Sequence, residues 1–481
     1  MGIEVNTQIN SAPAKMDGVK NVYFIGIGGI GMSAIARYFH ARGIKVSGYD
    51  KTETELVKQI KKEGIDVHFT EDVAAVPKDA DLVVYTPAVP KDHKELLYYQ
   101  QHNYKVVKRS DVLGCITAET FNICVAGTHG KTTISTIIAH ILRHSDYGCN
   151  AFLGGVSVNY NTNFWSSNNN VCVVEADEYD RSFLKLQPDI SVITAMDADH
   201  LDIYGDEKAM QDAFVEFGNK TKENGLLLSR FGLKRMEEVQ TAKKFTYSLQ
   251  NNSADVFASD IKINNGGYHF NMQVHNNRIS GIELNIGGMH NVENTLAAIA
   301  VANELDIEPE KIKAAIKEFK GIKRRFEYII APRPHQKGSY IQPVFIDDYA
   351  HHPEELNALL KSIKSLFPQR KSTIIFQPHL FTRTRDFAEE FAKSLQLADK
   401  IILLPIYPAR ELPIEGVTSE LILNKIDFEE KKSMSKEQLL EWIKTYSKSI
   451  NKEFGEVIIT AGAGDIDALV QPIKKIIEEA Q

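Results

Sequence analysis

Short apolar runs alternate with amphipathic stretches of helical period along most of the chain. The first run, Val22–Ile25, precedes a helical pattern that reaches about Arg42, and a second run follows at Ile44–Gly48. An apolar run of this length beside a helical pattern is typical of a strand buried in a parallel sheet. The pattern therefore predicts a doubly wound βαβ fold in the N-terminal region.

The alternation of apolar runs and helical stretches begins again at two later points in the chain. A second region begins with the apolar run Phe121–Ala126 and has more strand pattern from about 225 to 285, where Asn265-Gly266-Gly267 is a hairpin signal. The other predicted strands are Asp81–Tyr85, Val171–Val174, Ile190–Thr194, Val344–Ile346, Thr373–Phe376, Ile401–Leu404 and Val457–Thr460. We expect three α/β domains at 19–115, 116–325 and 326–481, after a flexible tail at 1–18.

Composition narrows the class of protein. A length of 481 residues fits two to four domains, and 43% hydrophobic with 25% charged residues is ordinary for a globular protein. The net charge of -7 offers no general basic field for nucleic acid. No apolar run reaches the ~18 residues of a membrane helix, and the N-terminus lacks a signal-peptide core. We expect a soluble cytoplasmic protein, monomer or homodimer, that binds neither nucleic acid nor membrane.

A glycine-rich segment joins the strand at Phe121–Ala126 to an apolar helix. It reads Gly127-Thr128-His129-Gly130-Lys131-Thr132-Thr133. In a phosphate-binding loop, Lys131 would contact the β- and γ-phosphates and the Thr132 hydroxyl would bind Mg²⁺. Val125 occupies the position of the first glycine in a full P-loop motif, so a plain strand–helix turn is the alternative. The strand–loop–helix order favours a nucleoside-triphosphate site.

Acidic residues follow two of the predicted strands. The first set begins with Glu175 and includes Asp177 and Glu178, and the second is Asp197-Ala-Asp199-His200-Leu-Asp202. A carboxylate at the carboxyl edge of the sheet suits a metal ion on the phosphates, and His200 could hold a second one. Solvated loops are the alternative interpretation. A later segment, His290-Asn291-Val-Glu-Asn294, places two amides on one helix face, although Asn291 suits an N-cap equally well.

Two further strand ends carry polar clusters. Near the N-terminus, Gly26-x-Gly28-x-x-Gly31 with Asp50 is typical of a dinucleotide or other pyrophosphate site. In the third region, Asp347-Asp348-Tyr349 ends one strand, and a segment containing His379, Arg383 and Arg385 ends the next. Such clusters suit a binding crevice, with the arginines on a carboxylate. The alternative is that these arginines form ion pairs at the surface. Arg324 and Arg325 could likewise be charged residues at a domain boundary without a role in binding.

Taken in order, these motifs resemble the Mur ligase family of ATP-dependent amide-bond ligases in peptidoglycan synthesis. The resemblance spans Gly26 to about Asp465 through GTHGKTT, VVEADEYD, DADHLD, HNVEN, GIKRRFE, DDYAHHP, QPHLFTRTRDF and AGAGD. It implies an N-terminal Rossmann-like UDP-sugar domain, a central P-loop-type ATPase domain with a mostly parallel sheet, and a C-terminal Rossmann-like domain for the amino acid and for closure. The segments GIGGIGMSAIA and DDYAHHP are typical of the member that joins L-alanine to UDP-N-acetylmuramate through an acyl phosphate.

The resemblance also implies roles for residues. ATP would contact the loop Gly127–Thr133 together with Asn291, Arg325 and Asp348, and Mg²⁺, in two sites, would contact Thr132, Glu175 and His200. The implied catalytic residues are Lys131, Glu175, His200, Arg325 and Asp348. The implied UDP-sugar residues are Gly28, Gly29, Gly31 and Asp50, and the implied amino-acid residues are Tyr349, His379 and Arg383. Leu380 stands where many alanine-adding members of the family have arginine. Tyr179 stands where many of them have a small residue.

Other activities fit parts of the same pattern. A nicotinamide-dependent oxidoreductase would use only Gly26–Gly31 and Asp50, and a nucleotide switch would use only Gly130-Lys131-Thr132. Within the family, the recycling ligase that adds a preformed tripeptide to the same UDP-sugar shares GTHGKTT and EADEYD. The DADHLD segment favours the ligase for a single amino acid. His200 and His379 are equal candidates for the base that deprotonates the amine.

Overall fold

The computed structural model describes residues 18–179, 181–197, 201–275, 277–333, 341–409, 411–451 and 453–480. The predicted tail, apart from Gly18, lies outside these residues. The chain forms two compact units: Met1–Gly155 with Thr162–Tyr247 and Glu304–Ile307, and Val156–Asn161 with Ser248–Asn303 and Glu308–Gln481. None of the helices in the described ranges is long and apolar enough to cross a membrane.

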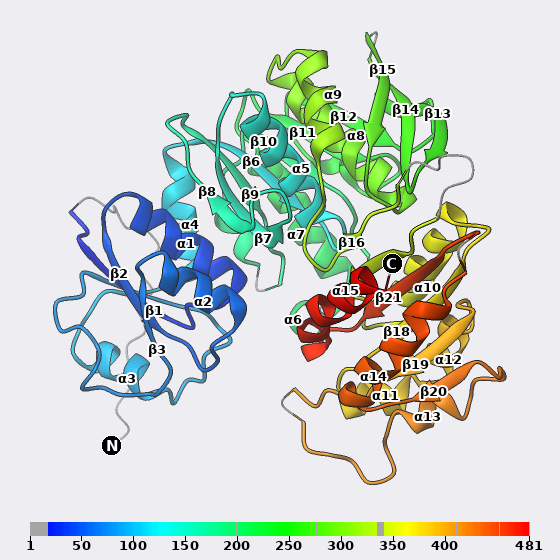
Figure 1. Cartoon of the computed structure of the whole chain (residues 1–481). Coiled ribbons are helices and arrows are strands. Elements are labelled where there is room, and N and C mark those ends of the chain that lie inside the picture. Colours follow the sequence, from blue (N-terminus) through cyan, green and yellow to red (C-terminus); the bar gives the residue numbers. More distant parts are fainter. Residues whose placement is uncertain are drawn as a thin grey trace. The chain divides into compact units, whose positions relative to one another are not determined.

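The first unit begins with a five-stranded parallel sheet of order β3-β2-β1-β4-β5, drawn in blue tones in Figure 1. Its strands are β1 (Asn21–Ile25), β2 (Lys45–Tyr49), β3 (Asp66–His68), β4 (Leu82–Tyr85) and β5 (Val106–Lys108), and its helices are α1 (Ile30–Ala41), α2 (Glu55–Lys62), α3 (Lys94–Gln101) and α4 (Arg109–Ala118). All five residues of β1 are buried, as expected for a central strand covered on both faces. The predicted doubly wound fold of this region is confirmed.

The first unit also holds seven strands in the order β12-β11-β10-β6-β9-β7-β8. The strands are β6 (Phe121–Ala126), β7 (Asn150–Ser157), β8 (Thr162–Trp165), β9 (Val171–Glu175), β10 (Ile190–Ile193), β11 (Leu226–Arg230) and β12 (Lys243–Ser248). The helices are α5 (Lys131–His144), α6 (Leu201–Tyr204) and α7 (Glu207–Asn219), with short 3-10 turns at Ser182–Lys185 and Met236–Glu238.

The strand β6 lies between β10 and β9 and is parallel to both. Its last residues pair with the ends of its neighbours: Val125 is opposite Glu175, and Ala126 is opposite Ile193. Parallel strands end at the same edge of a sheet. The loop after β6 and the acidic segment after β9 are therefore neighbours, as the sequence predicted.

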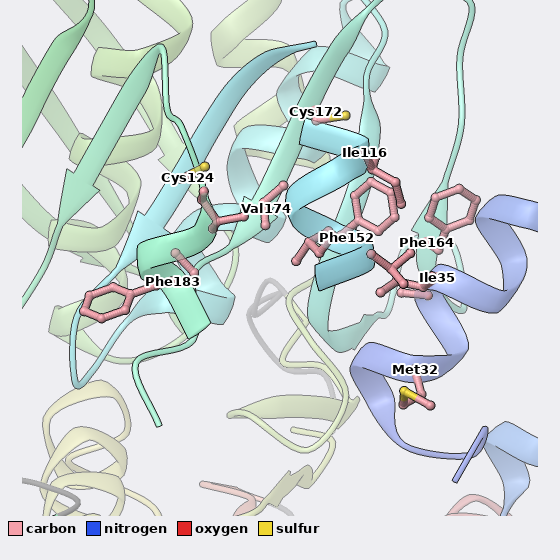
Figure 2. Packing of buried hydrophobic residues seen from close by; sticks show 14 of the residues in the cluster. Met32, Ile35, Ile116, Cys124, Phe152, Phe164, Cys172, Val174 and Phe183 are labelled. Atoms are coloured by element: carbon pink, nitrogen blue, oxygen red, sulfur yellow. The ribbon is translucent and has the colours of Figure 1, made fainter. Parts of the chain in front are cut away.

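One hydrophobic cluster joins the two sheets of the first unit. Figure 2 shows Ile35 of α1 near Phe152 and Phe164, which come from β7 and β8, with Met32 farther along the same helix. The two phenylalanine rings lie 5.3 Å apart between centroids. The buried Asn163 of β8 donates from Nδ2 to the carbonyl oxygen of Ile30. Helix α1 packs directly on β7 and β8. These contacts hold α1 in place, so a cavity between the two sheets has a rigid wall.

The second unit begins with an antiparallel meander, β13 (Val256–Asn264), β14 (Gly267–Val274) and β15 (Asn277–Leu284). The turn between β13 and β14 has positive φ at both Asn265 (48°) and Gly266 (80°), which is the pattern of a type I′ hairpin turn. The predicted hairpin is confirmed. The helices α8 (Met289–Glu304) and α9 (Pro309–Glu318) follow.

The rest of the second unit is a six-stranded sheet of order β16-β17-β21-β18-β19-β20, parallel except for the edge strand β16. The strands are β16 (Glu327–Ile330), β17 (Val344–Asp348), β18 (Lys371–Phe376), β19 (Lys400–Leu403), β20 (Lys431–Ser433) and β21 (Glu456–Ala461). The helices are α10 (Pro353–Leu366), α11 (Phe381–Asp386), α12 (Ala388–Leu395), α13 (Glu420–Leu423), α14 (Lys436–Tyr446) and α15 (Val470–Glu479), with short 3-10 turns at Ser447–Ser449 and Asp465–Leu469.

The predicted fold class is confirmed: parallel sheets with covering helices occur at the N-terminus, in the centre and at the C-terminus. The predicted domain boundaries stay predictions. The boundary after residue 115 falls inside α4, whereas the boundary after residue 325 falls just before β16. Register places Asp348 opposite Ala461, and Ala461 opposite Phe376, so three loops meet at one edge of the C-terminal sheet.

Candidate active site

The glycine-rich loop connects β6 to α5 in the predicted way. Gly130 precedes the helix with φ of +83°, a left-handed conformation that a side chain would strain. The loop is tied to the end of β10, because Thr128 donates its N–H to the carbonyl oxygen of Ala195 at 3.1 Å and Thr194 Oγ1 donates to the carbonyl oxygen of His129. The first N–H groups of α5 have no partner within the helix, so this end of α5 suits a phosphate.

Lys131 is paired with a buried carboxylate. Its Nζ donates to the carbonyl oxygen of Gly127 at 2.6 Å and to Oε1 of Glu178 at 2.8 Å. The side chains of Lys131 and Glu178 are 14% and 2% exposed. Burial raises the pKa of Glu178, and the charge of Lys131 opposes that rise. Glu178 therefore holds the ammonium group at the loop, a role that the sequence did not assign.

Thr132 and Glu175 meet as predicted. Thr132 Oγ1 donates to Oε1 of Glu175 at 3.1 Å, and the N–H of Gly154 donates to Oε2 of Glu175 at 3.0 Å. A hydroxyl and a carboxylate are oxygen ligands that Mg²⁺ prefers. No group of three His, Cys, Asp or Glu residues that could hold a metal ion occurs within the described ranges. The pair therefore fits a cation that takes its other ligands from phosphate and water.

The predicted second metal ligand, His200, lies outside the described residues, as does Asp199. The neighbouring Asp197 is described and accepts a hydrogen bond of 3.4 Å from Thr128 Oγ1. The ring of His129 is 75% exposed and lies 3.8 Å from Asp197.

The side chain of Asp50 binds the backbone of the N-terminal glycine-rich loop. The N–H of Gly28 donates to Oδ2 of Asp50 at 2.7 Å. A Cβ atom on Gly28 would lie 2.8 Å from that oxygen and 2.5 Å from Val57 Cγ2, so a larger residue does not fit. In the structure Asp50 binds the loop itself, and its contact with a ribose stays a prediction.

A cavity of about 270 Å³ in the first unit extends from the N-terminal glycine loop to the end of β9. Gly29 and Gly31 line it from the first loop, and Glu175 and Asp177 line it from the end of β9. Among the described residues that line the cavity, Arg109 is the only cation. Its guanidinium lies against Gly31 and donates from Nη2 to Oδ2 of Asp177 at 3.3 Å. An anionic ligand that reaches from the N-terminal loop to Glu175 would thus pass Arg109.

The edge of the C-terminal sheet holds two buried carboxyl groups. Burial raises the pKa of Asp347 to about 7 and the pKa of Asp348 to about 6. Asp348 accepts the N–H groups of Phe326 at 2.7 Å and Ala350 at 2.8 Å. These contacts hold Asp348 at the end of β17. Its predicted role in binding ATP stays a prediction.

Asp347 belongs to a network centred on Arg324. Its Oδ2 lies 3.4 Å from Arg324 Nε, and its Oδ1 accepts from Thr460 Oγ1 at 2.6 Å. Arg324 also donates from Nη2 to the carbonyl oxygen of Gly462. The side chain of Arg324 is 18% exposed, whereas Arg325 is an exposed residue. Arg324 is therefore a structural ion-pair residue, and the part of Arg325 in ATP binding stays a prediction.

Replacement of Asp347 by Asn should flatten the dependence of stability on pH. A carboxyl whose pKa is about 7 in the folded state and ~3.9 in the unfolded state favours folding when protonated, so stability is lost as pH rises through 7. We expect the free energy of unfolding of the natural protein to fall by more than about 1 kcal/mol between pH 5 and 8, relative to Asp347→Asn. Urea titrations at both pH values measure this difference. Equal slopes in Asp347→Asn and the natural protein would contradict it, and Asp467→Asn, at the exposed partner of Arg324, is the control.

The predicted amino-acid residues lie together in the second unit. The ring of His351 contacts the rings of Tyr349 (5.2 Å between centroids) and His379 (6.0 Å). His379 stacks on Tyr407, with centroids 5.8 Å apart. Burial lowers the pKa of His379, and the charges of His351 and Arg383 lower it further. Tyr349, His379 and Arg383 thus share one polar cluster, as predicted.

Leu380 has an unusual backbone in this cluster. Its φ is +70°, a conformation that costs a leucine about 1–2 kcal/mol. Its N–H donates to the carbonyl oxygen of Tyr407 at 2.9 Å, and its carbonyl oxygen accepts from the N–H of Thr384 at 3.1 Å. These bonds keep the neighbouring His379 beside Tyr407 despite the strain.

Asn291 is not an N-cap, so that alternative is wrong. It is the third residue of α8, and its Nδ2 donates to the carbonyl oxygen of Gly287 at 2.7 Å instead of capping an N–H group. Asn294 Nδ2 lies 3.3 Å from Asn291 Oδ1, which confirms that the two amides share a face. The contact of Asn291 with ATP stays a prediction.

Sequence reasoning did not assign roles to Arg109, Glu178, Arg324 and His351. Arg109, Glu178 and Arg324 each pair with a residue far along the chain, such as Asp177 for Arg109, which is 68 residues away. The partners of His351, in contrast, are the nearby Tyr349 and Glu355. The one local signal was the position of Glu178, three residues after Glu175 at the end of a strand.

The chain is similar to known proteins over nearly its whole length. It is 46% identical to the UDP-N-acetylmuramate--L-alanine ligases of Cytophaga hutchinsonii and Porphyromonas gingivalis strain W83, over 96% of this chain and 97% and 99% of those proteins. The solved UDP-N-acetylmuramate-alanine ligase of Thermotoga maritima has a TM-score of 0.78 at 27% identity, with 96% of this chain and 100% of that chain covered. A murein peptide ligase from Psychrobacter arcticus shares the fold, with a TM-score of 0.62 at 22% identity, over 95% of this chain and 98% of that one.

Three family models also match the chain in succession. Residues 21–120 match the model described as Mur ligase family, catalytic domain; residues 125–302 match the Mur ligase middle domain; and residues 324–464 match the Mur ligase, glutamate ligase domain. The resemblance inferred from the motifs is confirmed. The chain belongs to the Mur ligase family, whose members are ATP-dependent ligases.

Proposed function

We propose that this protein joins L-alanine to the carboxylate of UDP-N-acetylmuramate, with cleavage of ATP to ADP and phosphate. The reaction is a step of peptidoglycan precursor synthesis and takes place in the cytoplasm, where ATP is available. The relatives named UDP-N-acetylmuramate--L-alanine ligase, at 46% identity over 96% of the chain, support this substrate pair.

One observation of the structure carries the proposal. The cavity of about 270 Å³ is lined both by Gly29 and Gly31 and by Glu175, and Glu175 accepts a hydrogen bond from Thr132 beside Lys131. A nucleotide sugar whose diphosphate lies on the glycine loop could therefore extend its carboxylate to the γ-phosphate of ATP at the second loop. A nicotinamide oxidoreductase would not require a cavity that reaches from the N-terminal glycine loop to Glu175.

The first chemical step is activation of the carboxylate. A carboxylate has no leaving group for an amine to displace, so its oxygen attacks the γ-phosphorus of ATP and gives an acyl phosphate and ADP. Lys131 would contact the phosphoryl oxygens, where negative charge accumulates during transfer. Since Lys131 is bound to Glu178 in the structure, the ammonium group is already placed at the loop before ATP arrives.

Magnesium fits the same position. Thr132 Oγ1 and a carboxylate oxygen of Glu175 would hold it, and the ion would offset the charge of the phosphates and of the sugar carboxylate. A second ion on His200 is part of the proposal by family resemblance.

In the second step the amine of alanine attacks the acyl carbon, the amide bond forms, and phosphate leaves. The polar cluster of Tyr349, His379 and Arg383 would hold the amino acid. Arg383 Nη1 and His379 Nδ1 are buried and have no hydrogen-bond partner among the described residues. Both are groups that the carboxylate of an amino acid would satisfy.

An ADP-release assay tests the function. UDP-N-acetylmuramate and ATP are supplied with a panel of L-alanine, L-serine and glycine, and with the tripeptide that a recycling ligase would use. We expect release that requires both the UDP-sugar and L-alanine. Release with the tripeptide alone would instead assign the recycling activity, and release without any acceptor amine would contradict the ligase assignment.

Replacement of Arg109 by Ala should weaken binding of the UDP-sugar. Arg109 is the cation of the cavity and lies against Gly31, so its loss removes a charge-assisted contact worth about 1.5–3 kcal/mol. We expect KM for UDP-N-acetylmuramate to rise at least about tenfold, with KM for ATP within a few-fold. Asp177→Asn, which frees Arg109, is the matched control and should not raise that KM. Equal changes in the KM values of both substrates would contradict this role.

A further inference from the structure

A histidine–carboxylate pair lies beside the amino-acid cluster of the second unit. Nδ1 of His351 lies 3.0 Å from the carbonyl oxygen of Tyr349 and 3.2 Å from Oε2 of Glu355. A carbonyl and a carboxylate both accept hydrogen bonds, so Nδ1 must carry the hydrogen. In the neutral ring Nε2 is then the unprotonated nitrogen, with a lone pair that can take up a proton.

Glu355 is itself held in place. Its Oε2 accepts the backbone N–H groups of His351 at 2.8 Å and His352 at 3.0 Å, in the first turn of α10. These two donors fix the position of the carboxylate. The hydrogen bond to the Tyr349 carbonyl oxygen orients the ring. A carboxylate fixed 3.2 Å from Nδ1 stabilises the imidazolium when Nε2 accepts a proton.

The surroundings of His351 suit a neutral base. Burial lowers its pKa, Glu355 and the Tyr349 carbonyl raise it, and Arg383 and His352 lower it. The rings of Tyr349 and His379 pack against it. The unpartnered groups on Arg383 and His379 lie in the same cluster and offer a place for a carboxylate. One end of the cluster thus suits the carboxylate of an amino acid and another its amine.

We propose that His351, oriented by Glu355, accepts the proton of the incoming amine, an inference that rests on the proposed ligase function. The ammonium group of alanine gives one proton to Nε2, and the imidazolium keeps its Nδ1 hydrogen bond to the carbonyl oxygen of Tyr349, with Glu355 beside it. The amine lone pair then forms the bond to the acyl carbon, and the carbon–oxygen bond to phosphate breaks. The nitrogen loses its second proton to the departing phosphate, and the imidazolium returns its proton to water.

The test compares two acceptor amines in His351→Gln. Alanine must lose a proton before it attacks, whereas hydroxylamine is unprotonated at neutral pH and needs no base. We expect ligation of alanine to slow by at least about a hundredfold, as for loss of a general base. Formation of the acyl hydroxamate from UDP-N-acetylmuramate, ATP and hydroxylamine should stay within a few-fold of the natural protein. His352→Gln, which removes the adjacent imidazole, is the control and should leave both rates within a few-fold of the natural protein.

The outcomes separate the inference from the proposed function. Alanine ligation within a few-fold of the natural rate in His351→Gln would overturn the role of His351. If both reactions fail in that variant, Glu355→Gln decides. Loss of its charge should move the acidic limb of the rate profile for alanine to lower pH, and an unmoved limb would overturn the inference. A natural protein that forms neither product would instead refute the ligase function.

Discussion

Replacement of Lys131 by Ala should lower ligation by about a thousandfold or more. The ammonium group is the protein cation at the loop, and loss of a charge that stabilises a transferring phosphoryl group is among the largest single effects on catalysis. ADP release under saturating ATP, UDP-N-acetylmuramate and L-alanine measures the change. Turnover within a few-fold of the natural protein would contradict the assignment of the loop.

The structure adds a control to this experiment. Lys131→Ala leaves the 2% exposed carboxyl of Glu178 without its cation, and such a group is stable only when protonated. Because burial raises the pKa of Glu178, the stability of Lys131→Ala should fall as the pH rises. The double variant with Glu178→Gln should restore the stability without restoring turnover. Loss of activity is then separated from loss of fold.

Replacement of Arg324 by Ala should lower the free energy of unfolding by about 3–5 kcal/mol, as for one partner of a buried ion pair. The change leaves Asp347, whose side chain is 2% exposed, without its cation and frees the carbonyl oxygen of Gly462. The loss should be larger at pH 8 than at pH 5.5, because the pKa of Asp347 is about 7 and the protonated form needs no cation. Urea unfolding at the two pH values measures both effects.

The neighbouring arginine provides the comparison. Arg325→Ala removes an exposed side chain and should change stability by less than about 0.5 kcal/mol. The double variant Arg324→Ala with Asp347→Asn should regain part of the lost stability. If Arg324→Ala and Arg325→Ala destabilise the protein equally, the buried pair is not the cause.

The sequence by itself determined the elements and the chemistry that is local in the chain. Apolar runs and helical periods placed the central strands of all three sheets, and the order strand, glycine loop and helix identified the site of Lys131 and Thr132. These features depend on residues that are neighbours in the chain, so periodicity and turn chemistry suffice to find them. The meeting of Thr132 with Glu175 was also predictable, because parallel strands end at a common edge.

Only the tertiary structure decided which charged side chains pair. Lys131 binds Glu178, 47 residues away, and the buried cation beside β17 is Arg324 instead of the adjacent Arg325. Strand order, register and burial determine such pairs, and the pattern of neighbouring residues in the chain predicts none of these three. The contacts of His351 with Tyr349 and Glu355 are local in the chain, but its place beside His379 depends on the register of the C-terminal sheet.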